Sequence, residues 1–221
     1  MRSRSRPAAA SVRPAPNVGL TLFLAPNAWS SDWARLVLAE KEVDGAALRF
    51  ITPGVFDEDF VSLNPTQSLP TLADREGVIQ GGAVIAEYLD ERYPHPPLMP
   101  LVPAGRAKIR MLIRQLERDV FPLIEQLSGS TSEVASARLE LQRNLLSNAR
   151  IFPSRGYFFG AEYTLADTLW AILLRRMLAA GVTIPGDGGS MKSYAERLFT
   201  RPAFMRCFDR SAPVKSNSRK T

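Results

Sequence analysis

The first half of the chain alternates short hydrophobic runs with turn-forming residues. The runs cover Leu20–Leu24, Ala47–Ile51, Thr71–Ala73 and Val78–Gln80, each of strand length. After the N-cap candidates Ser30-Ser31-Asp32, apolar residues recur at helical spacing as far as about Glu42. A second helical segment follows Gly81-Gly82. Because a helix joins the first two strands, we expect those strands to be parallel.

The second half has helical periodicity throughout. The expected helices are one long amphipathic helix that continues through Ile109 to Leu127, a second from Ser132 to about Arg150, Leu165–Ala180, Gly189–Phe199 and Pro202–Arg210. The segment Leu165–Ala180 is apolar on nearly all sides, which is typical of a central, buried helix. These patterns predict α/β plus all-α architecture, with an N-terminal thioredoxin-like domain and a C-terminal helical bundle.

A proline-rich segment separates the two patterns. Pro94, Pro96, Pro97 and Pro100 surround His95, which is the single histidine of the chain. Proline fixes φ and removes a backbone donor, so we expect a stiff, extended segment at the surface. The predicted organisation is a disordered basic arm at 1–18, the thioredoxin-like domain at 19–93, a connector at 94–103, the helical domain at 104–211 and a disordered basic tail at 212–221.

Charge changes this picture at the ends of the chain. The net charge is +6, and seven basic residues lie in the two ends without an acidic neighbour: Arg2, Arg4, Arg6, Arg13, Lys215, Arg219 and Lys220. The remainder, 19–211, is close to neutral, so the body has no basic stripe for nucleic acid. The ends are predicted to be solvated, with contact to RNA or DNA as the alternative. A single cysteine, no apolar run of membrane-spanning length and no secretory signal indicate a cytoplasmic protein that does not enter a membrane.

Three motifs resemble the glutathione-transferase superfamily. Arg35–Lys41 resembles the first helix of that family, Ser68–Leu72 the turn before its third strand, and Tyr163–Asp167 the start of its central bundle helix. The resemblance implies the glutathione-transferase fold, with Pro70 in the cis form as a structural feature. Thr164 and Asp167 have the spacing of an N-cap residue and its capping-box acid.

The enzymes of that superfamily need a Ser, Tyr or Cys near the start of the first helix, to activate or attack the glutathione sulfur. Where a cysteine-containing relative would place this residue, the chain has Ala28. We interpret Ser30 and Ser31 as helix caps and not as catalytic hydroxyls. The carboxylate of Asp32 would oppose a thiolate in this first turn.

The enzymes also grip the γ-glutamyl end of glutathione with a Glu/Gln-Ser pair at the start of the third helix. Gly81-Gly82 occupies these positions here and offers no side chain. Two lost charge-assisted hydrogen bonds would weaken binding on the order of a hundredfold or more. We therefore predict no catalytic residues, no cofactor and no glutathione-transferase activity. The alternative is a divergent glutathione-dependent enzyme that uses Ser30, Ser31 or a backbone amide.

A narrower resemblance covers the proline-rich segment. The run Glu87–Pro100 resembles the stringent starvation protein A family, a bacterial branch of the same superfamily, and Leu38–Lys41, Leu63–Leu72 and Gly129–Glu133 support this. The resemblance implies a transcription regulator, active as a homodimer or as a heterodimer with a paralogue. It would bind RNA polymerase holoenzyme and its principal sigma factor, reach DNA and the nucleoid only through polymerase, and act in the stress response. The implied partner-binding residues are Tyr93, Pro94, His95, Pro96 and Pro97.

Simpler interpretations of single residues remain alongside this one. His95 could be a solvated or locally hydrogen-bonded ring in a connector; with no second histidine and no nearby cysteine it has no metal-ligand partners. Cys207 is interpreted as a packing residue. Trp29, Trp33 and Trp170 are interpreted as residues of the core or of a subunit interface.

Overall fold

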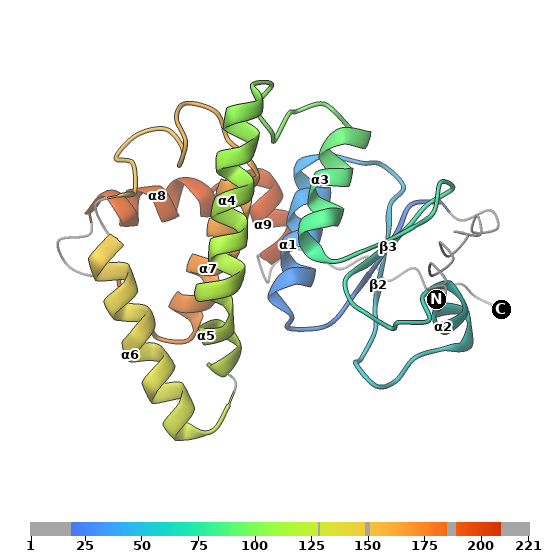
Figure 1. Ribbon diagram of the computed structural model, residues 1–221, viewed down its shortest axis with the longest axis horizontal. Coiled ribbons are helices and arrows are strands. Elements are labelled where there is room, and N and C mark those ends of the chain that lie inside the picture. The colour runs from blue at the N-terminus through green and yellow to red at the C-terminus, as the bar shows by residue number, and fades with distance from the viewer. Residues whose placement is uncertain (1–18, 128, 149–150, 185–188, 209–221) are drawn as a thin grey trace, which may run out of the picture.

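The computed structural model describes residues 19–127, 129–148, 151–184 and 189–208, so both predicted basic ends lie outside the described residues. A mixed β-sheet with its covering helices forms one half of the molecule and a helical bundle forms the other (Figure 1). Within the described residues, no helix is both long enough and apolar enough to span a bilayer.

Four short strands form the sheet in the order β2-β1-β3-β4. They are β1 (Thr21–Leu24), β2 (Ala47–Phe50), β3 (Thr71–Ala73) and β4 (Val78–Gln80). β1 pairs with β2 in parallel and with β3 in antiparallel register, and β4 is antiparallel to β3. The predicted runs and the predicted parallel pair are confirmed.

Alternation along the strands decides which helices cover which face of the sheet. Leu22, Leu24 and Leu72 are fully buried in the main core with α1 (Trp29–Glu40) and α3 (Gly82–Arg92). Phe23, between the two leucines of β1, points to the other face and contacts Phe60 of α2 (Glu58–Leu63). α1 and α3 therefore lie between the sheet and the helical half (Figure 1).

The helical half contains six described helices. They are α4 (Pro103–Asp119), α5 (Phe121–Gln126), α6 (Thr131–Asn148), α7 (Leu165–Ala179), α8 (Gly189–Phe199) and α9 (Pro202–Phe208). The prediction of one long helix through Leu127 is wrong, because the helix is interrupted at Val120. Pro122 explains the break: it has no backbone N–H to donate, and its ring excludes the carbonyl four residues earlier.

α7 is the centre of the helical half, as its apolar sequence predicted. Eleven of its residues are buried, and it begins at the N-cap residue Thr164. The fully buried carboxylate of Asp167 accepts the backbone N–H and the hydroxyl of Thr164, each at 2.9 Å, and the hydroxyl of Tyr194 at 2.6 Å. The predicted capping pair is therefore present. Burial, followed by the Asp167 charge, raises the pKa of Tyr194 and keeps this phenol protonated.

Polar contacts join α1 to the helical half along its whole length. The indole N–H of Trp33 donates to the hydroxyl of Thr168 at 2.7 Å. Near the other end, the buried carboxylate of Glu40 accepts hydrogen bonds from Nε and Nη2 of Arg201, at 2.8 and 2.7 Å. Because α1 is fixed to both halves, side chains at its two ends have defined positions.

Candidate functional site

The proline-rich segment follows α3 directly and lies at the surface. Pro94, His95, Pro96 and Pro97 are exposed, and Tyr93 is half-buried. The His95–Pro96 peptide is cis, and the chain bends at several positions between Tyr93 and Met99. The prediction of a surface segment is confirmed, but the prediction of an extended one is wrong. Leu98 and Met99 are buried, so the chain turns back into the core just after the exposed prolines.

A buried ion pair beneath the segment holds it in place. The ammonium of Lys41, whose side chain is completely buried, donates to the carboxylate of Asp90 at 2.5 Å and to the carbonyl of Pro96 at 2.6 Å. The same carboxylate accepts the backbone N–H of Leu98 at 2.7 Å. One pair of opposite charges thus fixes the backbone on both sides of Pro97, and both charges are hydrogen-bonded, as burial requires.

Three parts of the fold bring these groups together. Lys41 is the C-cap residue of α1, Asp90 lies in the last turn of α3, and the carbonyl of Leu98 accepts the N–H of Leu165 at the start of α7 at 2.9 Å. Sequence analysis missed Lys41 and Asp90 as functional residues, although both lie in runs that resemble the stringent starvation protein A family. Spacing could not reveal the ion pair, because its members are 49 positions apart.

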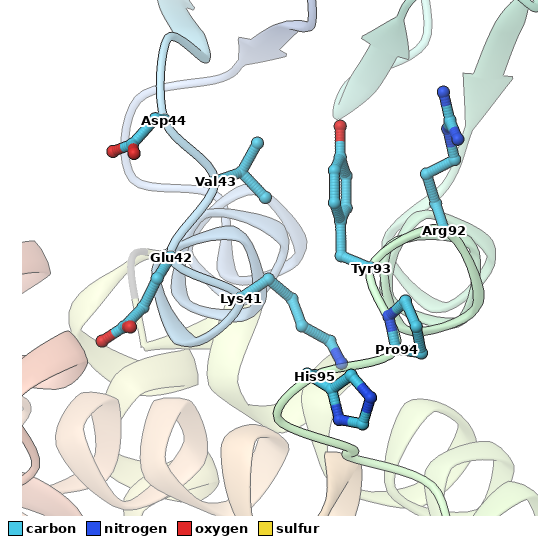
Figure 2. A pocket seen from close by; sticks show the side chains of 8 residues that line it. All are labelled: Lys41, Glu42, Val43, Asp44, Arg92, Tyr93, Pro94 and His95. Carbon is cyan, nitrogen blue, oxygen red and sulfur yellow. The ribbon is translucent and has the colours of Figure 1, made fainter.

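A pocket of about 440 Å³ opens beside the segment, between the end of α1 and the end of α3. Figure 2 shows the ring of Tyr93 facing Val43 across this space, with the Lys41 side chain extending toward the backbone near His95. Glu42 and Asp44 also line the pocket, but in this view their carboxylates point away from Tyr93. The walls that face one another are therefore largely apolar.

This arrangement suits recognition better than catalysis. Tyr93 and His95 offer amphipathic rings on a backbone that is already ordered, so little conformational entropy would be lost on binding. Arg92 lies 6.0 Å from the ring centre of Tyr93 and pairs with Glu76 at 3.4 Å. In the described part of the chain, no group of three or more His, Cys, Asp or Glu side chains could hold a metal ion.

The positions that bind glutathione in the enzymes lie at the opposite end of α1. Ala28 is the N-cap residue and provides no side-chain hydrogen bond, so the prediction that Ser30 and Ser31 are caps is wrong. Both serines lie inside the first turn of α1. The buried hydroxyl of Ser31 instead accepts the N–H of Ala25 at 2.9 Å and fixes the turn after β1.

Asp32 is compensated by two arginines of α7. Its carboxylate lies 2.8 Å from the guanidinium of Arg176 and 3.5 Å from that of Arg175. Burial lowers the pKa of Arg175, and the neighbouring Asp32 charge opposes that effect. The first turn of α1 therefore already holds an anion of the protein itself, at the place where a helix N-terminus favours negative charge.

The two glycines before and in α3 fit the local backbone. Gly81 has φ of +87°, which side-chain-bearing residues rarely adopt. A Cβ on Gly82 would lie 3.3 Å from Ser30 and from the ring of Trp33, so this glycine permits the close approach of α1 and α3. The Leu69–Pro70 peptide is cis, as predicted.

Cys207 and the tryptophans lie apart from this site. The thiol of Cys207 contacts the carbonyl of Arg35 at 3.7 Å, and burial raises its pKa. Trp33 and Trp170 are buried, as the core interpretation predicted. Trp29 stacks on Phe121 of α5 with ring centres 3.8 Å apart.

Comparisons with known proteins agree with this geometry. The family model for the glutathione S-transferase N-terminal domain matches residues 30–97. A glutathione S-transferase from Rhodospirillum rubrum superposes with a TM-score of 0.75 at 23% identity, over 89% of this chain and 94% of that one. FzlA from C. crescentus gives a TM-score of 0.74 at 24% identity, over 90% and 97%. These structures confirm the glutathione-transferase fold.

Proteins with similar sequences identify the family more narrowly than the structural matches do. The chain is 40% identical to the stringent starvation protein A homolog of Histophilus somni, over 88% of this chain and 92% of that protein. It is 42% identical to the homolog of Pasteurella multocida, over 81% and 85%. The maleylacetoacetate isomerase of Rattus norvegicus is 30% identical over 64% of this chain and 71% of that protein. The chain therefore belongs to the stringent starvation protein A family of the glutathione-transferase superfamily.

Proposed function

We propose that this protein is a transcription regulator that binds RNA polymerase holoenzyme, including its principal sigma factor, through the surface formed by Tyr93, Pro94, His95, Pro96 and Pro97. In this proposal it has no glutathione-transferase activity, needs no cofactor and reaches DNA and the nucleoid only through polymerase. One observation supports the proposal most directly. The exposed backbone of the segment is held from below by the buried Lys41–Asp90 ion pair.

That ion pair would help binding because it orders the proline-rich segment before a partner arrives. A loop that is ordered before binding pays less entropy when a partner immobilises it, so the same contacts give higher affinity. A spacer between two domains would not need its backbone carbonyl fixed by a buried ammonium. The adjoining pocket between Val43 and Tyr93 offers a recess for one side chain of the partner, next to the exposed rings.

The proposal includes a dimer, formed by two copies or with a paralogue. Val84 of α3 and Met111 of α4 are 59% and 71% exposed, and large apolar side chains at such exposure suit a subunit contact. The two helices are joined by Glu87 of α3, which pairs with the guanidinium of Arg110 of α4. A dimer would present two copies of the Pro-His-Pro surface. Sedimentation of the full chain measures the oligomeric state.

Holoenzyme capture tests the proposal. The triple variant Pro94→Ala/His95→Ala/Pro96→Ala should retain less than about a tenth of the wild-type holoenzyme in a pull-down with purified components, because several contacts near the centre of an interface are lost. Its Tm should stay within a few degrees of the wild type, since all three residues are exposed. The matched control is Thr52→Ala/Pro53→Ala/Val55→Ala, in an exposed loop of the same half. Undiminished capture by the Pro-His-Pro variant would contradict the proposal.

A divergent glutathione-dependent enzyme is the second candidate. The match to maleylacetoacetate isomerase favours it, because that relative is named for an enzyme activity. Titration calorimetry with glutathione separates the two candidates. A saturable signal with a Kd below about 1 mM would favour the enzyme, whereas our proposal expects none at that concentration.

A further inference from the structure

The outer edge of β2 is a part of the sheet that the described residues leave open. β2 pairs with β1 and with no other described strand, and its four residues are all exposed. The N–H of Ala47 points inward and donates to the carbonyl of Leu20 at 2.9 Å. Because the backbone groups of successive strand residues face opposite sides, those of Leu48 and Phe50 face outward, where they can pair with a further strand.

The side chains of the same two residues make this edge apolar. Leu48 is 44% exposed and Phe50 is 53% exposed. In the register with β1 they lie opposite Leu22 and Leu24, whose side chains are fully buried, so they extend the core face of the sheet to its margin. An open strand edge with exposed apolar side chains invites pairing with another segment, and the shortness of β2 limits this only in part. The edge therefore suits an extended segment.

Acidic residues flank β2 and narrow the class of occupant. The stretch 42–59 has five acids against the single arginine Arg49, a net charge of −4, and all five acids are exposed: Glu42, Asp44, Asp57, Glu58 and Asp59. Arg49 pairs with Asp57 at 2.9 Å, so the other four acids keep both flanks negative. Two copies of β2 side by side would bring like charges together, which is unfavourable, whereas a basic segment would be attracted.

The chain contains a basic segment immediately before β1. Residues 1–18 carry four arginines and no acid. Proline cannot donate to a β-ladder, and the proline-free run nearest to β1 that is at least as long as β2 is 8–13, with the sequence Ala-Ala-Ala-Ser-Val-Arg. Residues 14–18 would need to cross only from the edge of β2 to β1, which is about 10 Å or two strand spacings. The reach of the chain is therefore sufficient.

We propose that residues 8–13 add to the outer edge of β2 as an antiparallel strand. The direction follows from the chain path, because β1 and β2 are parallel and the segment must return to the start of β1. Arg13 then lies at the end of β2 that Glu42 and Asp44 flank, and the other arginines lie at the opposite end, near 57–59. Because the segment is tethered to the sheet, its effective concentration is on the order of millimolar, so weak contacts suffice. This pairing covers the open edge and is independent of the proposed polymerase binding.

Amide hydrogen exchange in the ¹⁵N-labelled full chain tests the proposal. The outward amides of Leu48 and Phe50 should exchange at least about tenfold more slowly in the wild type than in a variant that replaces the four arginines, Arg2→Gln/Arg4→Gln/Arg6→Gln/Arg13→Gln. Salt at about 0.5 M should speed their exchange in the wild type, because it screens the attraction between the segment and the acids. The inward amide of Ala47 should exchange equally in both chains, which shows that the sheet is intact.

The other basic end of the chain, 212–221, provides the matched control. Neutralising it with Lys215→Gln/Arg219→Gln/Lys220→Gln should leave the two outward amides of β2 protected. A spin label identifies the occupant directly: attached at Ser5→Cys in a Cys207→Ser chain, it should broaden the signals of Leu48 and Phe50, whereas a label at Ser216→Cys should not.

Four results would overturn the proposal. The first is fast exchange of both outward amides in the wild type, and the second is no broadening from the label at Ser5→Cys. Protection that is lost only in the 212–221 variant would assign the edge to that end of the chain. Protection that grows with protein concentration would assign it to a second copy.

Discussion

The two ends of α1 carry buried or partly buried charges of opposite sign, and these charges contact different parts of the molecule. At the N-terminal end, Ala28 provides no cap, and the Asp32 carboxylate is matched by Arg175 and Arg176. At the C-terminal end, the Lys41 ammonium is matched by Asp90 and also by a carbonyl of the exposed segment. The first arrangement uses its charges to join α1 to α7. The second uses them to order a surface.

Helix electrostatics explains why both ends are stable. A helix N-terminus favours a negative charge and a C-terminus a positive one, and Asp32 and Lys41 satisfy both preferences. In an enzyme of this superfamily the N-terminal preference would serve a bound thiolate, but here a carboxylate of the protein has that place. The difference teaches that one helix can use the charges at its two ends differently, for an internal contact with α7 at one end and for ordering a surface segment at the other.

Removing the carboxylate of Asp90 should have the largest effect. Asp90→Asn leaves the completely buried Lys41 ammonium without a counter-charge, so we expect a loss of about 3–5 kcal/mol in the free energy of unfolding. It also releases the segment, so holoenzyme binding should fall together with stability. Urea unfolding measures the first effect and pull-down the second.

The neighbouring Glu91→Ala is the matched control for Asp90→Asn. Glu91 pairs with Arg106 at 2.9 Å, but its side chain is 62% exposed, so the expected loss is below about 1 kcal/mol. If Asp90→Asn cost no more than Glu91→Ala, the Lys41–Asp90 ion pair would not hold the segment as described.

Placing side chains at Gly81 and Gly82 should reduce stability by an intermediate amount. Gly81→Glu places a side chain at φ of +87°, and Gly82→Ser places a Cβ 3.3 Å from Ser30 and Trp33. The double variant should lose about 1–3 kcal/mol of unfolding free energy. It should still not bind glutathione with a Kd below about 1 mM, because Ala28 provides no group for the sulfur.

Alanine substitutions separate the two contributions to that cost. Gly81→Ala tests the backbone conformation alone, since a Cβ there would meet nothing within 4 Å, and Gly82→Ala tests the contact with α1 alone. Gly54→Ala, at φ of +85° in open space, is the control for conformation in a different loop. Tight glutathione binding by the double variant would show that these glycines were the main barrier and would favour the enzyme candidate.

The charge pair at the N-terminal end of α1 should contribute less than the pair at the C-terminal end. Asp32→Ala should cost about 1 kcal/mol, because Asp32 and Arg176 retain roughly a fifth of their exposure and water compensates in part. Added salt should recover some of the loss by screening the two remaining arginines from each other. The denaturation midpoint at low and high salt measures both effects, with the exposed Asp44→Ala as control. A loss as large as that of Asp90→Asn would contradict the contrast between the ends.

The hydrophobic patterns along the sequence predicted most helices and strands correctly, because these elements depend on residues that are close together in the chain. The strands Thr71–Ala73 and Val78–Gln80 follow from short apolar runs between turn signals, and the buried central helix follows from its apolar residues. The parallel pairing of the first two strands follows from the helix that joins them. The break at Val120 was missed because the apolar spacing continues across it, although Pro122 was the available sign. Ser30 and Ser31 resembled caps, yet the helix begins just before them, at Trp29.

Sequence analysis predicted the exposed residues of the candidate site but not the buried residues that support them. Pro94 to Pro97 could be predicted to be exposed because proline disfavours regular structure, and the structure places them there. Their support could not be predicted, because the Lys41–Asp90 pair depends on how α1 packs against α3. A lysine near a helix end is usually solvated, and periodicity does not distinguish that case from a buried one.

Substitution of His95, a predicted partner-binding residue, should have the smallest effect on stability. His95 is exposed and lies above the ion pair, so His95→Ala should change the free energy of unfolding by less than about 0.5 kcal/mol. Holoenzyme binding should nevertheless weaken about tenfold, which corresponds to loss of one substantial interface contact. Val55→Ala, which truncates another exposed side chain, should leave both quantities unchanged. If His95→Ala lowered stability and binding equally, the ring would support the segment, and recognition would rest on Tyr93 and the prolines. If it lowered neither, the surface would act through its backbone and the neighbouring pocket.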